Sequence, residues 1–151
     1  MKKYFLTISI FCAVQFSAKS QTAIDSIKAV INTTFLAMKT SDTILLKTAF
    51  ADNAILQTTG RNKEGDMAIV TLSVGDFAKA VSTFPAGAID EQIQYETIKI
   101  DRNIAAVWAP YKLYIKGNFH QCGVNSLQLI RLDGLWKILH ILDTRSKIGC
   151  E

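Results

Sequence analysis

Polar side chains suited to proton transfer and ligand binding are concentrated in the carboxy-terminal third of the chain. Asp143 and His120 offer a carboxylate and an imidazole, groups that often act as general acids and bases. Tyr111 offers a hydroxyl that can donate a hydrogen bond to a developing oxyanion, and Arg145 places a cation close to Asp143. These residue types predict a candidate catalytic pair, Asp143 and His120, with Tyr111 and Arg145 beside it.

Asp143 and Arg145 can also be interpreted as a static ion pair that takes no part in catalysis. Exposed pairs of this kind contribute about 0–1 kcal/mol to stability. They are far commoner than catalytic pairs, so an ion pair at the rim of a cavity is our first interpretation of these two residues.

Turn residues divide the second half of the chain into four β-rich segments. The strongest turn signal is Asp133-Gly134, a favoured two-residue hairpin loop. Short loops make consecutive strands antiparallel neighbours, so we expect a four-strand meander. Pro110 and Gly123 are the expected bends in these long strands. The predicted strands cover residues 89–101, 104–116, 119–132 and 135–145.

The turns also give a register for the meander. A two-residue loop at Asp133-Gly134 pairs Val124 with Asp143, and one at Gly117-Asn118 places Tyr111 beside Val124. Paired residues project to the same face of a sheet, although one bulge would exchange the faces. An aliphatic face with a few convergent polar groups is typical of a small-molecule site. That face collects the main candidates: Tyr111, His120, Ser126, Asp143 and Arg145.

The opposite face of the predicted meander contains three further ligand-binding candidates, Trp108, Asn125 and His140. Our first interpretation of His140 is a core histidine with one hydrogen bond, and the alternative is a proton carrier near Trp108 and Asn125. His120 and His140 are the only histidines and lack metal-binding spacing, so we predict no metal and no cofactor.

Cys122 and Cys150 are predicted to form a disulfide. The register places Cys122 opposite Arg145, and Cys150 follows close enough for the tail to fold back. A bridge would add on the order of 3 kcal/mol by closing the intervening loop. The alternatives are two free thiols and a frayed terminus.

The residue pattern of the amino-terminal half predicts helices and one short strand. An apolar stripe after a capping box at Thr22 and Asp25 predicts the first helix, and Ser41-Asp42 begins a second. A short strand over 54–59, a polar loop over 60–65 and a third helix beginning at Ser73 follow. Helices followed by a meander predict an α+β fold in which the helices cover one sheet face.

Residues 1–20 have the pattern of an export signal. Lys2 and Lys3 precede an apolar run over 4–16, and Ala18-Lys19-Ser20 predicts cleavage after Ser20. We therefore expect one domain over 21–151, periplasmic or secreted, without stable membrane insertion.

Composition and charge exclude several classes of protein. With 49% hydrophobic and 20% charged residues, the 151-residue chain does not resemble a disordered, collagen-like or coiled-coil protein. The net charge of +4 falls to +1 when Lys2, Lys3 and Lys19 leave with the signal (14 basic against 13 acidic residues). No basic stripe remains, so we expect no nucleic-acid partner.

The order of these elements resembles the NTF2-like, or SnoaL-like, cone fold. The most specific residues are His-Gln-Cys-Gly-Val-Asn-Ser at 120–126, Asp-Gly-Leu-Trp-Lys-Ile at 133–138 and Asp-Thr-Arg at 143–145. They are similar to the secreted bacterial branch described as putative lumazine-binding. The resemblance implies amino-terminal helices on a strongly bent antiparallel sheet. It also implies a homodimer formed through the sheet, with Trp108, Tyr114 and Lys112 as surface candidates.

Three functions compete at this point. We favour a noncatalytic protein that binds a small apolar or heterocyclic ligand in the cone, since no complete acid–base pair can be assembled. The alternatives are a cofactor-independent isomerase, dehydratase or hydrolase using Asp143 and His120, and a structural dimerisation module. An open cavity containing a carboxyl group with a raised pKa would favour the enzyme, and an open cavity without any perturbed titratable group would favour the binder. A closed aliphatic interior would favour the module.

Overall fold

The computed structural model describes residues 8–61 and 65–150. Residues 1–7 of the predicted export signal lie outside the described residues. Within the described part of the chain, no helix is both long enough and apolar enough to cross a membrane.

Among residues 8–61 and 65–150, three helices precede or interrupt the sheet: α1 (Ile8–Thr40), α2 (Thr43–Thr48) and α3 (Val74–Ser82). The side chain of Asp42 caps α2 by accepting hydrogen bonds from the N–H groups of Ile44 and Leu45. Ser73 caps α3 as predicted. The predicted helix start at Thr22 is wrong, because α1 continues through it from Ile8 and no helix-breaking residue stands in between.

In the described part of the chain, seven strands form one sheet in the order β2-β1-β7-β6-β5-β3, with β4 also paired to β5. The meander is antiparallel as predicted, but β1 pairs in parallel with β7, which makes the sheet mixed. The strands are β1 (Phe50–Arg61), β2 (Met67–Ser73), β3 (Ile89–Ile93), β4 (Thr97–Asp101), β5 (Ile104–Ile115), β6 (Asn118–Leu132) and β7 (Leu135–Asp143).

Three parts of the sheet differ from the sequence prediction, and the first is β1, which is longer than the strand predicted over 54–59. The segment over 89–101 is split into β3 and β4, which pair with opposite ends of β5. The N–H groups of Gln94 and Glu96 bridge the interruption by donating to the carbonyls of Pro110 and Trp108. The edge strand β2 was not predicted, because its exposed apolar residues do not alternate as those of a half-buried strand do.

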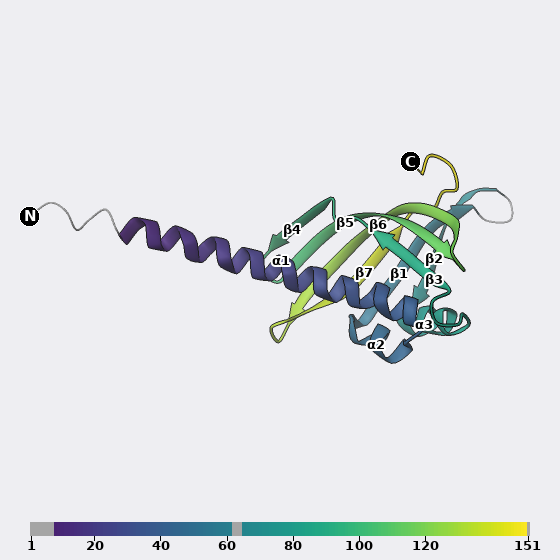
Figure 1. The fold of residues 1–151 in the computed structure, drawn as a ribbon, viewed down its shortest axis with the longest axis horizontal. Coiled ribbons are helices and arrows are strands. Elements are labelled where there is room, and N and C mark those ends of the chain that lie inside the picture. Colours follow the sequence, from purple (N-terminus) through teal and green to yellow (C-terminus); the bar gives the residue numbers. More distant parts are fainter. Residues whose placement is uncertain (1–7, 62–64, 151) are drawn as a thin grey trace, which may run out of the picture.

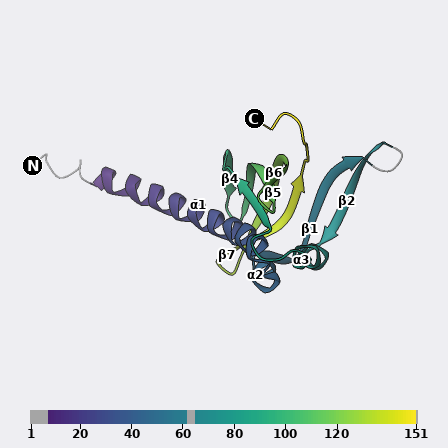
Figure 2. The same ribbon diagram turned by 45° about the vertical axis from the view of Figure 1, so that its right-hand side comes forward.

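The sheet curves around the helices, as Figures 1 and 2 show from two directions. The carboxy-terminal half of α1 packs on the concave face through Ile27, Ile31 and Met38, and its amino-terminal half extends beyond the sheet. The concave side of the meander supplies Val107, Leu127 and Ile138 to the same core. This arrangement confirms the predicted α+β cone with helices on one face.

A different turn and a bulge shift β5 against β6. The loop is Lys116-Gly117, with both residues at positive φ, so glycine takes the second loop position as it does in Asp133-Gly134. A bulge at His120 follows. Tyr111 therefore pairs with Gly123 and not with Val124.

A second bulge, at Leu139, shifts β7 against β6. Leu129 pairs with Ile138 as the hairpin predicts, but beyond the bulge Asp143 pairs with Asn125 and not with Val124. Since a shift of one residue exchanges the two faces of a strand, Asn125 turns to the concave face and Val124 to the convex face. The backbone of Cys122 likewise pairs with Ser146 in an isolated antiparallel β-bridge, and not with Arg145 as predicted.

Candidate functional site

An open cavity of about 480 Å³ lies between the helices and the concave face of the sheet. Its volume lies within the usual range for small-molecule sites. Most of its wall is apolar and comes from α1, α3 and several strands. The larger apolar lining residues include Phe35, Met38, Leu72, Phe77, Phe84 and Leu113.

Glu91 on β3 supplies a carboxyl group to the polar part of the cavity wall. Its Oε1 accepts a hydrogen bond of 2.8 Å from Nδ2 of Asn125 on β6. Burial raises the pKa of Glu91 to about 7, an effect that the Asn125 hydrogen bond opposes and the charge of Asp143 strengthens. The Glu91 carboxyl can therefore exchange a proton near neutral pH.

Tyr111 connects three parts of the polar wall. Its hydroxyl lies 3.0 Å from the carbonyl of Thr144 and 3.5 Å from Oδ2 of Asp143, and it accepts a hydrogen bond from Nε2 of Gln121. Burial and the nearby charges of Asp143 and Glu91 raise the pKa of the Tyr111 hydroxyl. The hydroxyl is thus protonated and held in position by its neighbours.

Asp143 and Arg145 form an ion pair at the edge of the cavity. Nε of Arg145 donates to Oδ2 of Asp143 at 2.8 Å, and both residues line the cavity. This geometry agrees with the rim ion pair that was our first interpretation. His120 also lines the cavity, but none of the described hydrogen bonds joins it to Asp143, so the geometry does not support the Asp143–His120 pair.

Thr58 supplies a hydroxyl from β1. Its side chain lines the cavity, is 9% exposed, and pairs across the sheet with Asp143. Oγ1 of Thr58 has no hydrogen-bond partner among the described residues. A buried hydroxyl without a partner is costly, and a bound molecule would relieve that cost.

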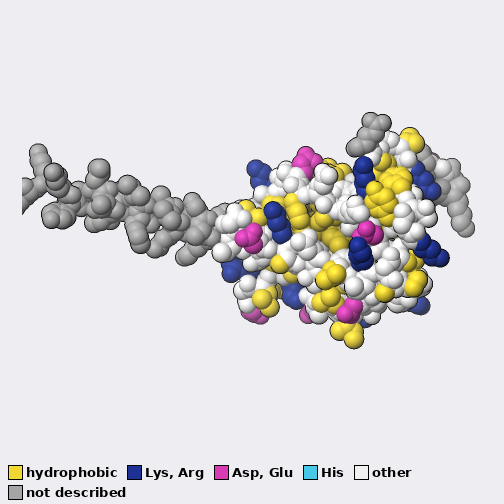
Figure 3. Space-filling view, in the orientation of Figure 1, with side chains coloured by type: hydrophobic (Ala, Val, Ile, Leu, Met, Phe, Trp, Pro, Cys, Tyr) yellow, Lys and Arg dark blue, Asp and Glu magenta, His cyan; other side chains and the backbone are white. Residues whose placement is uncertain are grey.

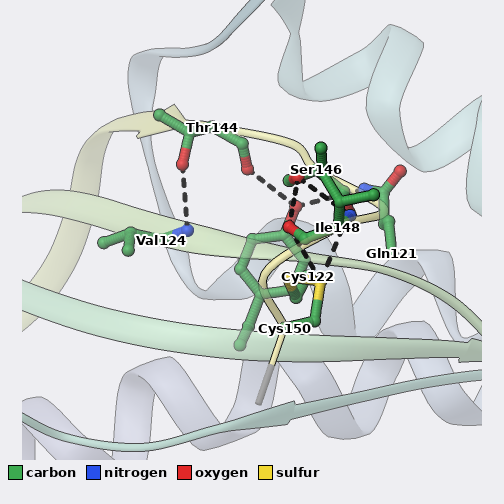
Figure 4. The surroundings of a disulfide bond; sticks show 8 residues. Gln121, Cys122, Val124, Thr144, Ser146, Ile148 and Cys150 are labelled. Carbon is green, nitrogen blue, oxygen red and sulfur yellow. Dashed lines mark hydrogen bonds between the residues drawn. A yellow bond between two sulfur atoms is a disulfide. The ribbon is translucent and has the colours of Figure 1, made fainter.

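The carboxy-terminal tail lies along β6 at the polar side of the cavity, and Figure 4 shows its contacts near the disulfide. Two hydrogen bonds join Thr144 to Val124, and two more join Ser146 to Cys122. The structure contains the predicted disulfide between Cys122 and Cys150, with their Cα atoms 5.7 Å apart. The tail is thereby held against β6, which positions the Thr144 carbonyl and Arg145.

Three predicted ligand-binding residues lie away from the cavity. Ser126 pairs with Trp108 on β5 and with Leu142 on β7, and this row faces the convex side of the sheet. His140 lies on the same side, where its Nε2 is 3.1 Å from Oε1 of Gln57. The bulge at Leu139 accounts for the position of Ser126, whereas Trp108 lies three residues before Tyr111 on β5 and therefore faces the opposite side of the sheet, as predicted. Trp108 lies where the dimer surface is expected, and the dimer stays a prediction.

Glu91 and Gln121 were missed by the sequence analysis. A signal for Glu91 does exist, because Ile89 and Ile93 flank it at steps of two and place a charged residue on the apolar face of a strand. Nothing local indicates Gln121, since its direction depends on the bulge at His120.

Proton exchange and oriented ligand binding are the two chemical capacities of this arrangement. Glu91 can give or take a proton, while Asn125, Tyr111 and Gln121 hold the polar groups in place.

Figure 3 shows that on the described part of one molecular face, Lys and Arg side chains are interspersed with acidic and apolar ones.

Comparison with solved structures identifies the fold. An NTF2-like protein of unknown function from Shewanella baltica OS155 has a TM-score of 0.67 at 12% identity, covering 83% of this chain and 94% of that one. Another, from Silicibacter pomeroyi DSS-3, has a TM-score of 0.66 at 16% identity, covering 84% and 98%. A protein described as a putative dehydratase from the NTF2-like family of Streptomyces avermitilis has a TM-score of 0.61 at 13% identity, covering 84% and 98%.

Comparison with protein families and with curated proteins gives different results. No curated protein matches the chain. The model of the family described as "Putative lumazine-binding" matches residues 22–141, which is most of the chain. By that match the chain belongs to the putative lumazine-binding family, within the NTF2-like fold.

Proposed function

We propose that this protein binds one small, largely apolar molecule inside the cavity, with the polar end of the molecule against Glu91, Asn125 and Thr58. The observation that carries the proposal is the open cavity of about 480 Å³, whose mostly apolar wall contains the hydrogen-bonded pair Glu91 and Asn125. Sites of this form bury the ligand body by the hydrophobic effect and orient it through a few hydrogen bonds. The family description is consistent with this proposal, because lumazine is a small bicyclic heterocycle.

Native mass spectrometry followed by denaturing mass analysis tests the proposal. We expect a bound molecule that is present in the native spectrum and lost on denaturation, or saturable binding of apolar ring compounds to the emptied protein. Asn125→Leu should weaken binding by removing the amide from the cavity. The control is Gln128→Leu, an exposed position on the convex side of the same strand, which should leave binding unchanged. Absence of both bound mass and saturable binding would contradict the proposal.

An enzyme that transfers a proton is the second candidate, because Glu91 has its pKa raised to about 7 beside an apolar cavity. A carboxyl group with a raised pKa in an open cavity favours an enzyme. Glu91 would take the role that the sequence analysis gave to Asp143 and His120, removing a proton from the ligand and returning it at another atom.

Deuterium exchange into the ligand recovered by mass spectrometry distinguishes the enzyme from the binder. In D₂O an enzyme would replace a carbon-bound hydrogen of the ligand with deuterium, and Glu91→Gln would abolish that exchange while retaining binding. A ligand recovered without deuterium would support the noncatalytic binder.

Export is a further proposal and rests on the segment over residues 1–20. A basic start, an apolar run and small residues before Gln21 support it. Mass analysis of the chain expressed in a bacterium with its own export machinery should give a mature protein that begins at Gln21. A chain that keeps Met1 or Lys2 in the cytoplasm would contradict it.

A further inference from the structure

Unused hydrogen-bond acceptors dominate the polar end of the cavity. Glu91 accepts the described bond through Oε1 only, and Asp143 accepts its bonds through Oδ2 only. Asn125 uses its Nδ2, and its Oδ1 receives none of the described hydrogen bonds. Together with Oγ1 of Thr58, these atoms give the cavity wall four oxygens that lack a donor within the described chain.

The sheet register places these oxygens near one another. Thr58 pairs with Asp143 across β1 and β7, and Asp143 pairs with Asn125 across β7 and β6. Directly paired residues project to the same face, so the three side chains form one row across three adjacent strands. Glu91 joins this row through its 2.8 Å hydrogen bond with Asn125.

The charges around the row favour a hydrogen-bond donor over an anion. Two carboxylates, Glu91 and Asp143, face the cavity beside one guanidinium. Arg145 is half exposed at the rim and directs its Nε to Asp143, so its charge is largely offset by that partner. When both carboxylates are ionised, this end of the cavity carries a net charge of about −1. A ligand carboxylate or phosphate would meet repulsion there.

We propose that the cavity selects ligands whose polar end is a planar group with two or more N–H donors, such as an amidine or an aminopyrimidine, on an apolar ring body. This inference rests on the proposed binding function and names the chemistry that the bound molecule presents. Planar groups with paired N–H donors match carboxylate oxygens in a two-pronged geometry. The apolar wall accommodates the ring body.

Affinity for a ligand with N–H donors should depend on pH through Glu91. The charged or titratable side chains that face Glu91 across the cavity are Tyr111 on β5, His120 on β6, Asp143 on β7 and Arg145 after it, while the lining residues of α1 and α3 carry no charge. An N–H donor prefers the ionised form of Glu91. Affinity for such a ligand should therefore rise with pH through the titration of Glu91 near pH 7, whereas a ligand carbonyl would show the opposite trend.

Four probes that share one naphthalene body test the inference by titration calorimetry with the full exported chain. The probes are 2-naphthamidine, 2-naphthamide, 2-naphthoate and 2-methylnaphthalene. We expect 2-naphthamidine to bind at least about tenfold more tightly than 2-naphthoate, in line with the strength of charge-assisted hydrogen bonds.

Variants link the preference to the acceptor row. Glu91→Gln and Thr58→Val should each reduce the preference for 2-naphthamidine, so the test does not depend on one variant folding. The matched control is Asp90→Asn, which changes the neighbouring carboxylate on the outer side of β3, where Asp90 pairs with Lys39. That variant should keep the preference.

The outcomes separate this inference from the proposed function. Binding of 2-methylnaphthalene together with equal or tighter binding of 2-naphthoate than of 2-naphthamidine would overturn the inference and leave the binding function standing. An unchanged preference in folded Glu91→Gln and Thr58→Val proteins would also overturn it. Failure of all four probes to bind would count against both.

Discussion

The side chain of Asn125 on β6 donates to Glu91 on β3, although β5 lies between these two strands in the sheet. On β5 the partner of Asn125 is Ala109, which is fully buried, and the partner of Glu91 is Leu113, so the two side chains meet diagonally across that strand. The contact places a carboxyl group in an apolar cavity with a single neutral hydrogen-bond donor.

Glu91 should make the protein less stable as the pH rises toward neutrality. The folded chain keeps the Glu91 proton up to about pH 7, whereas the unfolded chain releases it near the ordinary value of 4.5. Because the folded state binds more protons in this window, the free energy of unfolding falls as the pH rises from 4.5 to about 7. Urea unfolding of Glu91→Gln and the parent chain across this window should show that the substitution removes part of the fall.

Asp90→Asn is the control for that measurement. Hydrogen bonds from Gln92 and Lys39 lower the pKa of Asp90, so its ionised form favours the folded state and its pH effect has the opposite sign. If Glu91→Gln and the parent chain had parallel stability profiles, Glu91 would titrate at its ordinary value and the proton-transfer candidate would lose its support.

Tyr111→Phe should destabilise the protein by about 1–2 kcal/mol, because the Thr144 carbonyl and the Gln121 amide both lose a buried partner. Thermal or denaturant unfolding measures the effect. Tyr114→Phe is the control on the same strand, since Tyr114 faces the convex side and its ring packs edge-on against Phe119. Equal effects of the two substitutions would show that the Tyr111 hydroxyl does not hold the tail.

The hairpins and the α+β order follow from local residues, and the face assignments depend on bulges. Asp133-Gly134 specifies its turn, so the pairing of Leu129 with Ile138 was predictable. Tyr111 and Asp143 were expected on one face, and the structure places both on the concave face. Each is shifted by one residue from its predicted pairing with Val124, so the two shifts compensate.

Residues beyond the bulges could not be placed in the same way. Asn125 and Ser126 exchange faces because a bulge adds one residue to one strand, and no local pattern marks where it occurs. The parallel pairing of β1 with β7 joins segments that are far apart in the chain, so no turn between them can reveal it. The hydroxyl of Thr58 reaches the site only through that pairing.

Gly123→Ala should displace the carboxy-terminal tail. A Cβ atom at Gly123 would lie 1.9 Å from the carbonyl oxygen of Thr144 and 2.9 Å from the Tyr111 ring. Because backbone atoms cannot move aside as a flexible side chain can, we expect a loss of about 2–4 kcal/mol and weaker ligand binding. Gly60→Ala is the control, since its Cβ would meet no atom within 4 Å. Retained stability in Gly123→Ala would show that the tail is not fixed against β6.

Removal of the disulfide should loosen the tail without unfolding the sheet. Cys122 and Cys150 enclose a 28-residue separation, and loss of such a bond costs about 2–4 kcal/mol when the whole loop gains freedom. The hydrogen bonds between Cys122 and Ser146 and between Val124 and Thr144 keep part of the tail in place, so we expect the lower end of that range. The Cys122→Ala, Cys150→Ala double variant should therefore remain folded and bind ligand more weakly, because Arg145 and the Thr144 carbonyl are less firmly positioned. Hydrogen exchange at the amides of Thr144 and Ser146 measures the loosening, and unchanged exchange with unchanged affinity would show that the sheet contacts alone position the tail.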